Sequence, residues 1–108
     1  MQLKKIVAII RNRFLIDVEA RLVEMRVKGI SVTKVKGYGE YANFFNHNWL
    51  VTHSQIEIFT EEGRVDEIVA AIMETANTGQ EGDGILAILP VSKLYRIRTK
   101  SEITQDEF

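Results

Sequence analysis

The strongest constraint on the fold is that one order of residue patterns occurs twice along the chain. Each half of the 108-residue sequence holds a strand pattern, a one-faced helix pattern and a second strand pattern. Apolar residues make up 45% of the chain and charged residues 27%, which is ordinary for one folded domain. The repeat therefore predicts a single domain of β-α-β-β-α-β order and excludes a disordered chain.

The first half begins with a short run rich in β-branched residues, 3–10, which predicts a strand buried on both faces. A one-faced helix is expected next, with its apolar positions at Leu15, Val18, Leu22 and Met25. Gly29 stands where a glycine would end that helix. Residues 29–36 alternate between apolar and polar and predict a second strand, which the glycines of 37–39 interrupt.

The second half repeats this order after a stretch without clear periodicity. Residues 55–59 alternate as a third strand. The clearest helix pattern of the chain follows, with apolar positions at Val65, Ile68, Val69, Ile72, Met73 and Ala76. Gly79 is the expected cap of that helix. A fourth strand is predicted over 85–89, where Pro90 stops it, and a short fifth strand over 91–97.

This order predicts a ferredoxin-like α+β sandwich, in which an antiparallel four-stranded sheet carries two helices on one face. The domain is expected to span 1–98, with a flexible polar tail over 99–108. The second face of such a sheet would expose Ile, Val and Leu, which predicts an oligomer.

Charge and cysteine content narrow the class of protein. The formal net charge is −1, so composition does not predict binding to nucleic acid. The chain has no cysteine, which excludes disulfides and favours a cytoplasmic location. No pairing of a nucleophile with a base and an orienting acid stands out in the sequence, so we expect no enzymatic activity.

Two segments have residue types that suit an anion. Residues 78–84 hold three glycines between a helix and a strand, so that backbone N–H groups can converge on a phosphate, although a plain turn would look similar. Arg96 and Arg98 would share one face of a strand and offer two guanidinium groups. A solvated strand end is the alternative for these arginines.

Three segments together resemble a known family. VKGYG at 35–39, TGQEGDG at 78–84 and RIRT at 96–99 are similar, in order and spacing, to the signature segments of the PII signal-transduction family. The resemblance extends over nearly the whole chain. It implies a homotrimer of the ferredoxin-like fold that binds ADP, AMP or ATP in the clefts between subunits. It also implies control of a target protein, such as a membrane transporter, through a long segment called the T-loop.

The resemblance also implies which residues form the nucleotide site. One subunit would contribute Ser31, Tyr38, Gly39, Gly82, Asp83 and Gly84. Its neighbour would contribute Gly29, Glu57, Arg96 and Arg98. In this assignment Glu57 accepts hydrogen bonds from the ribose, and the arginines pair with phosphate oxygens.

The chain departs from the family pattern at the charged positions. Ile85 stands where the family usually has a lysine that reaches the phosphates, and Glu40 stands where it has an arginine. Tyr41 replaces the glutamine that binds Mg²⁺ in members that sense 2-oxoglutarate. These departures favour ADP or AMP over Mg-ATP and leave the role of Mg²⁺ open.

Residues 40–54 correspond to a shortened T-loop. Its aromatic side chains, Phe44, Phe45 and Trp49, are the expected contacts with a partner protein. His47 and His53 are candidate metal ligands, although two histidines six residues apart form no standard motif, and solvated histidines are the alternative. A second interpretation therefore stays open, namely a trimer that responds to a metal or an anion such as bicarbonate, similar to the divalent-cation tolerance proteins.

Overall fold

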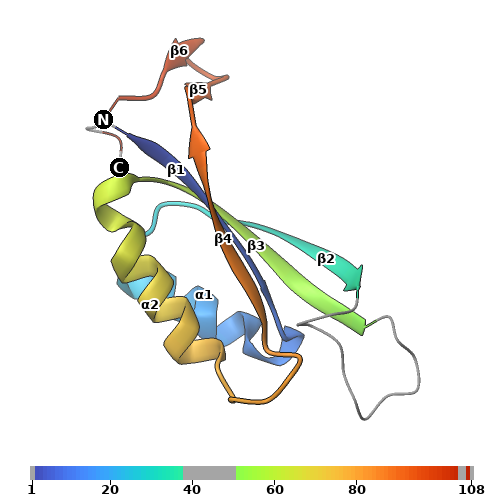
Figure 1. The fold of residues 1–108 in the computed structure, drawn as a ribbon. Helices are drawn as coiled ribbons and strands as arrows, with labels where there is room; N and C mark the ends of the chain where they lie inside the picture. The colour runs from blue at the N-terminus through green and yellow to red at the C-terminus, as the bar shows by residue number, and fades with distance from the viewer. Residues whose placement is uncertain (1, 38–50, 105–106, 108) are drawn as a thin grey trace.

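The computed structural model describes residues 2–37, 51–104 and 107. Four strands form one antiparallel sheet in the order β2-β3-β1-β4. The strands are β1 (Leu3–Ile10), β2 (Ser31–Gly37), β3 (Val51–Glu61) and β4 (Gly84–Val91). Helices α1 (Leu15–Glu24) and α2 (Val65–Ala76) lie together on one face of this sheet (Figure 1), each preceded by a short 3₁₀ turn, η1 (Asn12–Phe14) or η2 (Glu62–Arg64). This architecture confirms the predicted ferredoxin-like fold.

The core lies between the helices and the two central strands. Even-numbered residues of β1 and β3 point toward the helices, because successive side chains of a strand alternate between its faces. The apolar core consists of Ile6, Ala8, Ile10, Val18, Leu22, Ile56, Ile58, Ile68, Ile72 and Ala76. Burial of one isoleucine side chain contributes about 1.5–3 kcal/mol, so this cluster is the main source of stability.

The opposite face of the sheet has no cover in the described chain. Phe59, Ile85 and Leu89 on this face are 42%, 46% and 42% exposed, beside the half-buried Val7 and Ile9. One charged pair interrupts the apolar surface, because the ammonium group of Lys5 lies 3.3 Å from a carboxylate oxygen of Glu57. The same ammonium group lies 5.7 Å from the centre of the Phe59 ring.

Helix α1 ends earlier than the sequence predicts, so the assignment of Gly29 as its cap is wrong. The helix stops at Glu24, and Arg26 adopts a left-handed φ of 61°. The N–H groups of Arg26 and Val27 donate to the carbonyls of Val23 and Leu22, which is the Schellman arrangement usually made by glycine. Arg64 satisfies two further carbonyls, at Met25 and Arg26, and thereby stabilises this terminus.

Helix α2 has the bounds that its periodicity predicts, but Gly79 is not its cap. Asn77 is the C-cap residue with extended angles, and Gly79 follows in the loop with a φ of 82°.

Strand β4 continues to Val91 through Pro90, so the prediction that Pro90 stops it is wrong. A proline lacks the N–H group that a central strand needs for its ladder, but β4 is an edge strand of the sheet. The predicted fifth strand over 91–97 is also incorrect. Only β5 (Tyr95–Arg96) forms, and it pairs with β6 (Ser101–Glu102) in a separate hairpin.

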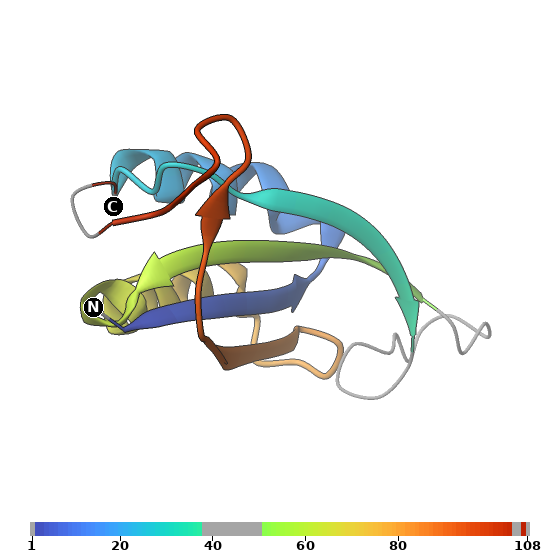
Figure 2. The ribbon, with the colours of Figure 1, turned by 90° about the horizontal axis from the view of Figure 1, so that it is seen from above.

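The chain after β4 crosses the end of the sheet toward the β2 edge, and the hairpin lies on that crossing (Figure 2). The backbone N–H of Ile103 donates to the carbonyl of Leu94, and the ammonium group of Lys28 donates to the carbonyl of Glu107. These contacts join described parts of segment 99–108 to the domain, where the sequence favours a loose tail.

The loop predicted over 40–54 ends before Val51, because Val51–Glu61 form the long strand β3. The remaining part of that loop lies outside the described residues. Among the described residues, neither helix is long and apolar enough to cross a membrane.

Gly84 begins β4 at a place that allows no side chain. Its φ is 116°, and a Cβ added there would lie 1.8 Å from the carbonyl oxygen of Ile9. We expect Gly84→Ala to lower the free energy of unfolding by about 3 kcal/mol or more, because strain and a backbone clash add. Gly29→Ala is the matched control, since a Cβ there meets nothing within 4 Å. Equal stabilities of the two variants in urea unfolding would contradict this account.

Candidate functional site

The glycine-rich loop, residues 78–84, is organised around the carboxylate of Asp83. One carboxylate oxygen accepts the backbone N–H groups of Thr78 and Gly79, each at 2.9 Å. The other accepts the Thr78 hydroxyl at 2.5 Å and the Arg11 guanidinium at 3.2 Å. Arg11 also donates to the carbonyl of Glu81 at 2.8 Å. Asp83 is therefore an internal anchor of the loop, and the backbone of the loop remains the part that can face an anion.

Asp83 ionises more readily than an ordinary aspartic acid. Its burial opposes the charged form and would raise its pKa, but hydrogen bonds outweigh this effect and lower the pKa from 3.8 to about 2. The Thr78 hydroxyl makes the largest favourable contribution, ahead of the Thr78 amide, Arg11 and the Gly79 amide. The loop is thus held by a carboxylate that stays ionised at physiological pH.

His53 also holds the loop, from the start of β3. Its side chain is only 2% exposed, and its Nε2 atom lies 3.0 Å from the carbonyl oxygen of Gly82. A carbonyl can only accept, so Nε2 is the donor. The alternative that His53 is solvated is therefore wrong. Three elements, namely the end of β1, the loop itself and β3, fix the position of residues 78–84.

A second candidate region is a cavity of about 360 Å³ at the other end of the sheet. It is lined by residues of the α1–β2 connection, of β3 and α2, and of the chain after β4. Of the predicted nucleotide residues, it contains Gly29, Ser31, Glu57 and Arg96. Ser31 therefore lies with Gly29 and Glu57, whereas the resemblance groups it with the glycine-rich loop.

The cavity has more basic than acidic side chains. Its charged lining residues are Arg26, Lys28, Arg64, Arg96, Glu57 and Glu107. Arg64 is already engaged by two carbonyls and by Glu67 at 2.6 Å. Arg96 forms an ion pair with Glu107. The cavity can therefore receive an anionic group, because its excess of positive charge lowers the cost of burying one.

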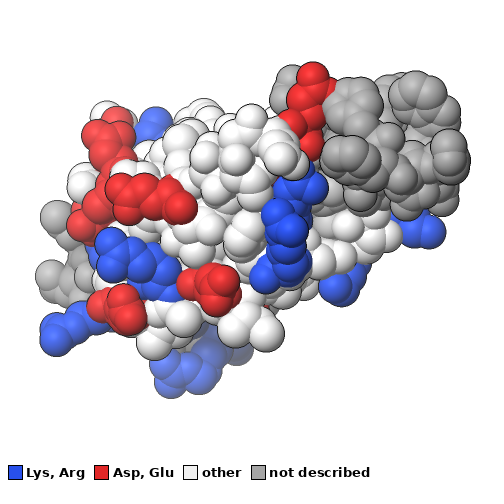
Figure 3. Space-filling model, turned by 90° about the horizontal axis from the view of Figure 1, so that it is seen from below, with Lys and Arg blue, Asp and Glu red and all other residues white. Residues whose placement is uncertain are grey.

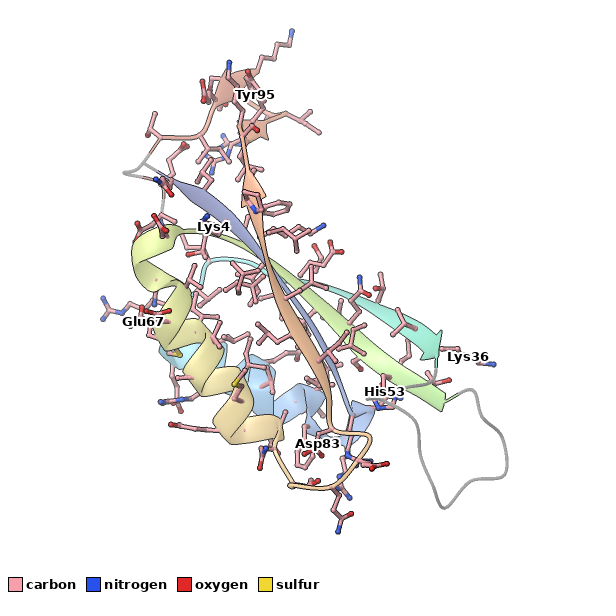
Figure 4. The ribbon with its side chains drawn as sticks, viewed as in Figure 1. Lys4, Lys36, His53, Glu67, Asp83 and Tyr95 are labelled. Carbon is pink, nitrogen blue, oxygen red and sulfur yellow. The ribbon has the colours of Figure 1, made fainter. Side chains whose placement is uncertain are left out.

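The two regions lie at opposite ends of the sheet within one chain. In Figure 4, Asp83 and His53 lie at the end of the sheet where β4 begins, and Tyr95 lies beyond the end where β4 finishes. The eight residues of β4, about 25 Å at the usual rise of a strand, separate the loop from Arg96, which lines the cavity. One chain thus cannot bring both regions onto a single small ligand.

The remaining predicted residues are placed differently or lie outside the described chain. Arg98 is exposed in the turn between β5 and β6, so the prediction that it shares a strand face with Arg96 is wrong. The other predicted positions fall among residues 38–50, outside the described chain: Tyr38, Gly39, Glu40, Tyr41, Phe44, Phe45, His47 and Trp49.

Sequence reasoning missed several residues that hold the glycine-rich loop or the cavity in its shape. The sequence patterns assign no role to Arg11, Lys28 or Glu107, and Thr78 enters them only as the first residue of the glycine-rich segment. A signal for Arg11 does exist, because the antiparallel pairing of β1 with β4 places Ile10 opposite Gly84 and hence Arg11 beside Asp83. No comparable signal marks Glu107, since its contact depends on how the tail crosses the sheet.

Acidic and basic side chains lie intermixed on the face shown in Figure 3. In the part of the chain that the structure describes, no three His, Cys, Asp or Glu residues come together as a metal-binding group. His53 is in contact with Gly82, and His47 lies outside that part.

Comparison with known proteins assigns the chain to a family. The family described as nitrogen regulatory protein P-II matches residues 3–101. The chain belongs to the P-II family. The nitrogen regulatory protein P-II of Synechocystis is 36% identical over 110 residues, covering 95% of this chain and 98% of that protein. The P-II protein of Pasteurella multocida is also 36% identical, over 107 residues, covering 93% of this chain and 96% of that protein.

Solved structures agree with this assignment. The crystal structure of Arabidopsis thaliana PII bound to citrate superimposes with a TM-score of 0.79 at 29% identity, covering 93% of this chain and 84% of that chain. The resemblance seen in the three sequence segments is therefore confirmed, and with it the membership in a family of nitrogen-regulatory signalling proteins.

The Asp83 anchor gives the P-II chain a pH-dependent stability. The pKa of Asp83 is lower in the folded protein than in the unfolded chain, so its contribution is present above about pH 5 and is lost as pH falls through about 2. We expect Asp83→Asn to lower the free energy of unfolding by about 1–2 kcal/mol at pH 7 and by less at pH 2.5. Urea unfolding at both pH values measures this difference. Glu81→Gln, an exposed change in the same loop, should alter stability little at either pH.

Proposed function

We propose that this P-II chain is a signalling protein without catalytic activity, which binds an adenine nucleotide between the subunits of a homotrimer and regulates a partner protein. The observation that carries the proposal is the separation of the two candidate regions. The glycine-rich loop and the basic cavity are both suited to an anionic ligand, yet they lie at opposite ends of the sheet. A second copy of the chain can supply the missing half to each.

The open face of the sheet supports assembly of several copies. Phe59, Ile85 and Leu89 expose apolar surface on one side of the molecule. Apolar surface gathered on one face is typical of a contact between proteins. Assembly through this face would cover it while bringing sheet ends of neighbouring subunits together.

A nucleotide with few charges fits the described residues better than ATP does. In the described chain, Arg11 is the cation whose contacts with the glycine-rich loop are established, and its guanidinium is already engaged by Asp83 and by the Glu81 carbonyl. Ile85 stands where the family resemblance predicts a lysine. Fewer cations at the phosphates favour ADP or AMP over ATP, since each added phosphate charge needs a partner.

For the regulated partner protein, we propose a segment of contact and an expected class. Segment 40–54, with Phe44, Phe45 and Trp49, is proposed to contact the regulated protein, for which a transporter is the expected class. A cytoplasmic location likewise remains a prediction from the sequence.

The nucleotide site can be tested by thermal unfolding. We expect ADP at a hundredfold excess over its dissociation constant to stabilise the protein by about 2.7 kcal/mol, which raises Tm by roughly ten degrees. Arg96→Gln should weaken binding about tenfold or more, because it removes a charge-assisted contact. Arg21→Gln on α1 is the control, since Arg21 pairs with Glu24 on the same helix and does not line the cavity. A melting curve of the unaltered protein that neither ADP, AMP nor ATP moves would refute the site.

The assembly can be tested separately by light scattering. We expect a mass of three times the 12.4 kDa chain for the unaltered protein. Ile85→Glu should give the mass of one chain, because Ile85 lies opposite the apolar Ile9, so a charge there would be buried without a partner in the contact between sheets. Ile16→Glu adds the same charge on the exposed side of α1, where Ile16 is 76% exposed, and should leave the trimer intact. A single-chain mass for the unaltered protein at micromolar concentration would refute the proposed assembly.

A further inference from the structure

The side chain of Glu107 lies in the basic cavity and contacts the groups that an anionic ligand would use. Its carboxylate forms an ion pair with the guanidinium of Arg96. The second carboxylate oxygen accepts the backbone N–H of Thr104 at 2.7 Å. The ammonium group of Lys28 donates to the main-chain carbonyl of Glu107 at 3.1 Å and so holds the backbone beside this ion pair. Two oxygens on one centre, one facing a cation and one facing an amide, reproduce the contacts that bind a phosphate group.

We propose that Glu107 is an internal competitor for the anion subsite formed by Arg96 and the Thr104 amide, so that the phosphate group of a ligand binds there only by displacing the Glu107 carboxylate. This inference rests on the proposed nucleotide function, because it names how binding at that same cavity is regulated.

The strength of this competition depends on how far the Arg96–Glu107 ion pair is exposed to water. The side chains of Arg96 and Glu107 are 36% and 29% exposed, so water and salt screen their attraction. A pair of this kind is weak enough for a phosphate group to displace, because the phosphate carries more charge than one carboxylate and offers more acceptor oxygens. Removing the competitor should therefore raise affinity several-fold rather than by orders of magnitude.

The chain offers a matched control for the variant Glu107→Gln. Glu102 lies in β6 of the same tail, is exposed and does not line the cavity. Glu102→Gln thus removes the same charge from the same segment without touching Arg96. We would titrate the unaltered protein and both variants by calorimetry with ADP and, as a probe that lacks base and ribose, with inorganic pyrophosphate.

The expected result is that Glu107→Gln binds ADP and pyrophosphate about three- to tenfold more tightly, while Glu102→Gln changes either affinity less than twofold. The gain should shrink as salt is raised. In an Arg96→Gln background, the second change Glu107→Gln should bring no gain, because the subsite has lost its main cation. The proposed competition would be refuted if Glu107→Gln and Glu102→Gln bound the probes with equal affinity. It would also be refuted if the full gain in affinity from Glu107→Gln persisted in the Arg96→Gln background.

The two probes separate this inference from the proposed function. If ADP binds the unaltered protein and Glu107→Gln equally, the nucleotide function stands and the competitor is refuted. If pyrophosphate shows the gain while ADP binds no variant, the competitor stands and the nucleotide function is refuted. If neither probe binds any variant, both are refuted.

Discussion

The rest of the structure depends on strand β1 and its pairing with two neighbours. It is bonded to β3 on one side and to β4 on the other, and its even-numbered side chains build the core against the helices. A shift of its register by one residue would turn Ile6, Ala8 and Ile10 to the open face. The same register places the Ile9 carbonyl against Gly84 and Arg11 beside Asp83. One strand thus sets both the core and the position of the glycine-rich loop.

This dependence explains why the loop has a defined shape although it lies at the surface. Connections between a helix and a strand are usually mobile, because few contacts hold them. Here the Asp83 carboxylate accepts hydrogen bonds from two backbone amides, a hydroxyl and a guanidinium. His53, on β3, donates a hydrogen bond to the Gly82 carbonyl. A loop that is already ordered loses little conformational entropy when a ligand binds. The backbone groups of 78–84 are therefore prepared for binding by residues that do not themselves need to touch the ligand.

The extent to which the sequence predicts this structure follows from how local each feature is. Strand 3–10, helix 65–76 and the order of the sheet were accessible, because apolar periodicity is a local signal and two β-α-β halves leave few topologies. The end of α1 is not accessible from local patterns, because the carbonyl of its C-cap residue Met25 accepts a hydrogen bond from Arg64, 39 residues later in the chain. The strand through Pro90 was not accessible either, because periodicity does not reveal that β4 lies at an edge.

The candidate site divides in the same way. The glycines of 78–84 and the arginine at 96 were identified from a pattern of residues, and the structure places them in regions that suit an anion. Residues that act through long-range contacts, such as Arg11, His53 in its buried position and Glu107, carry no pattern of their own. Such residues decide how each region is held, so family resemblance locates the site but does not describe its energetics.

The position of Glu107 gives the competition a second consequence. Thermodynamic linkage requires that if the Glu107 contact lowers the affinity for a ligand by some factor, the ligand weakens the Glu107 contact by the same factor. Binding in the cavity would then release the Glu107 side chain from Arg96. The tail leaves the domain at the end of the sheet opposite the glycine-rich loop, as the positions of Tyr95 and Asp83 show (Figure 4). A single ligand held between two chains could therefore change both the loop end of one subunit and the tail end of its neighbour.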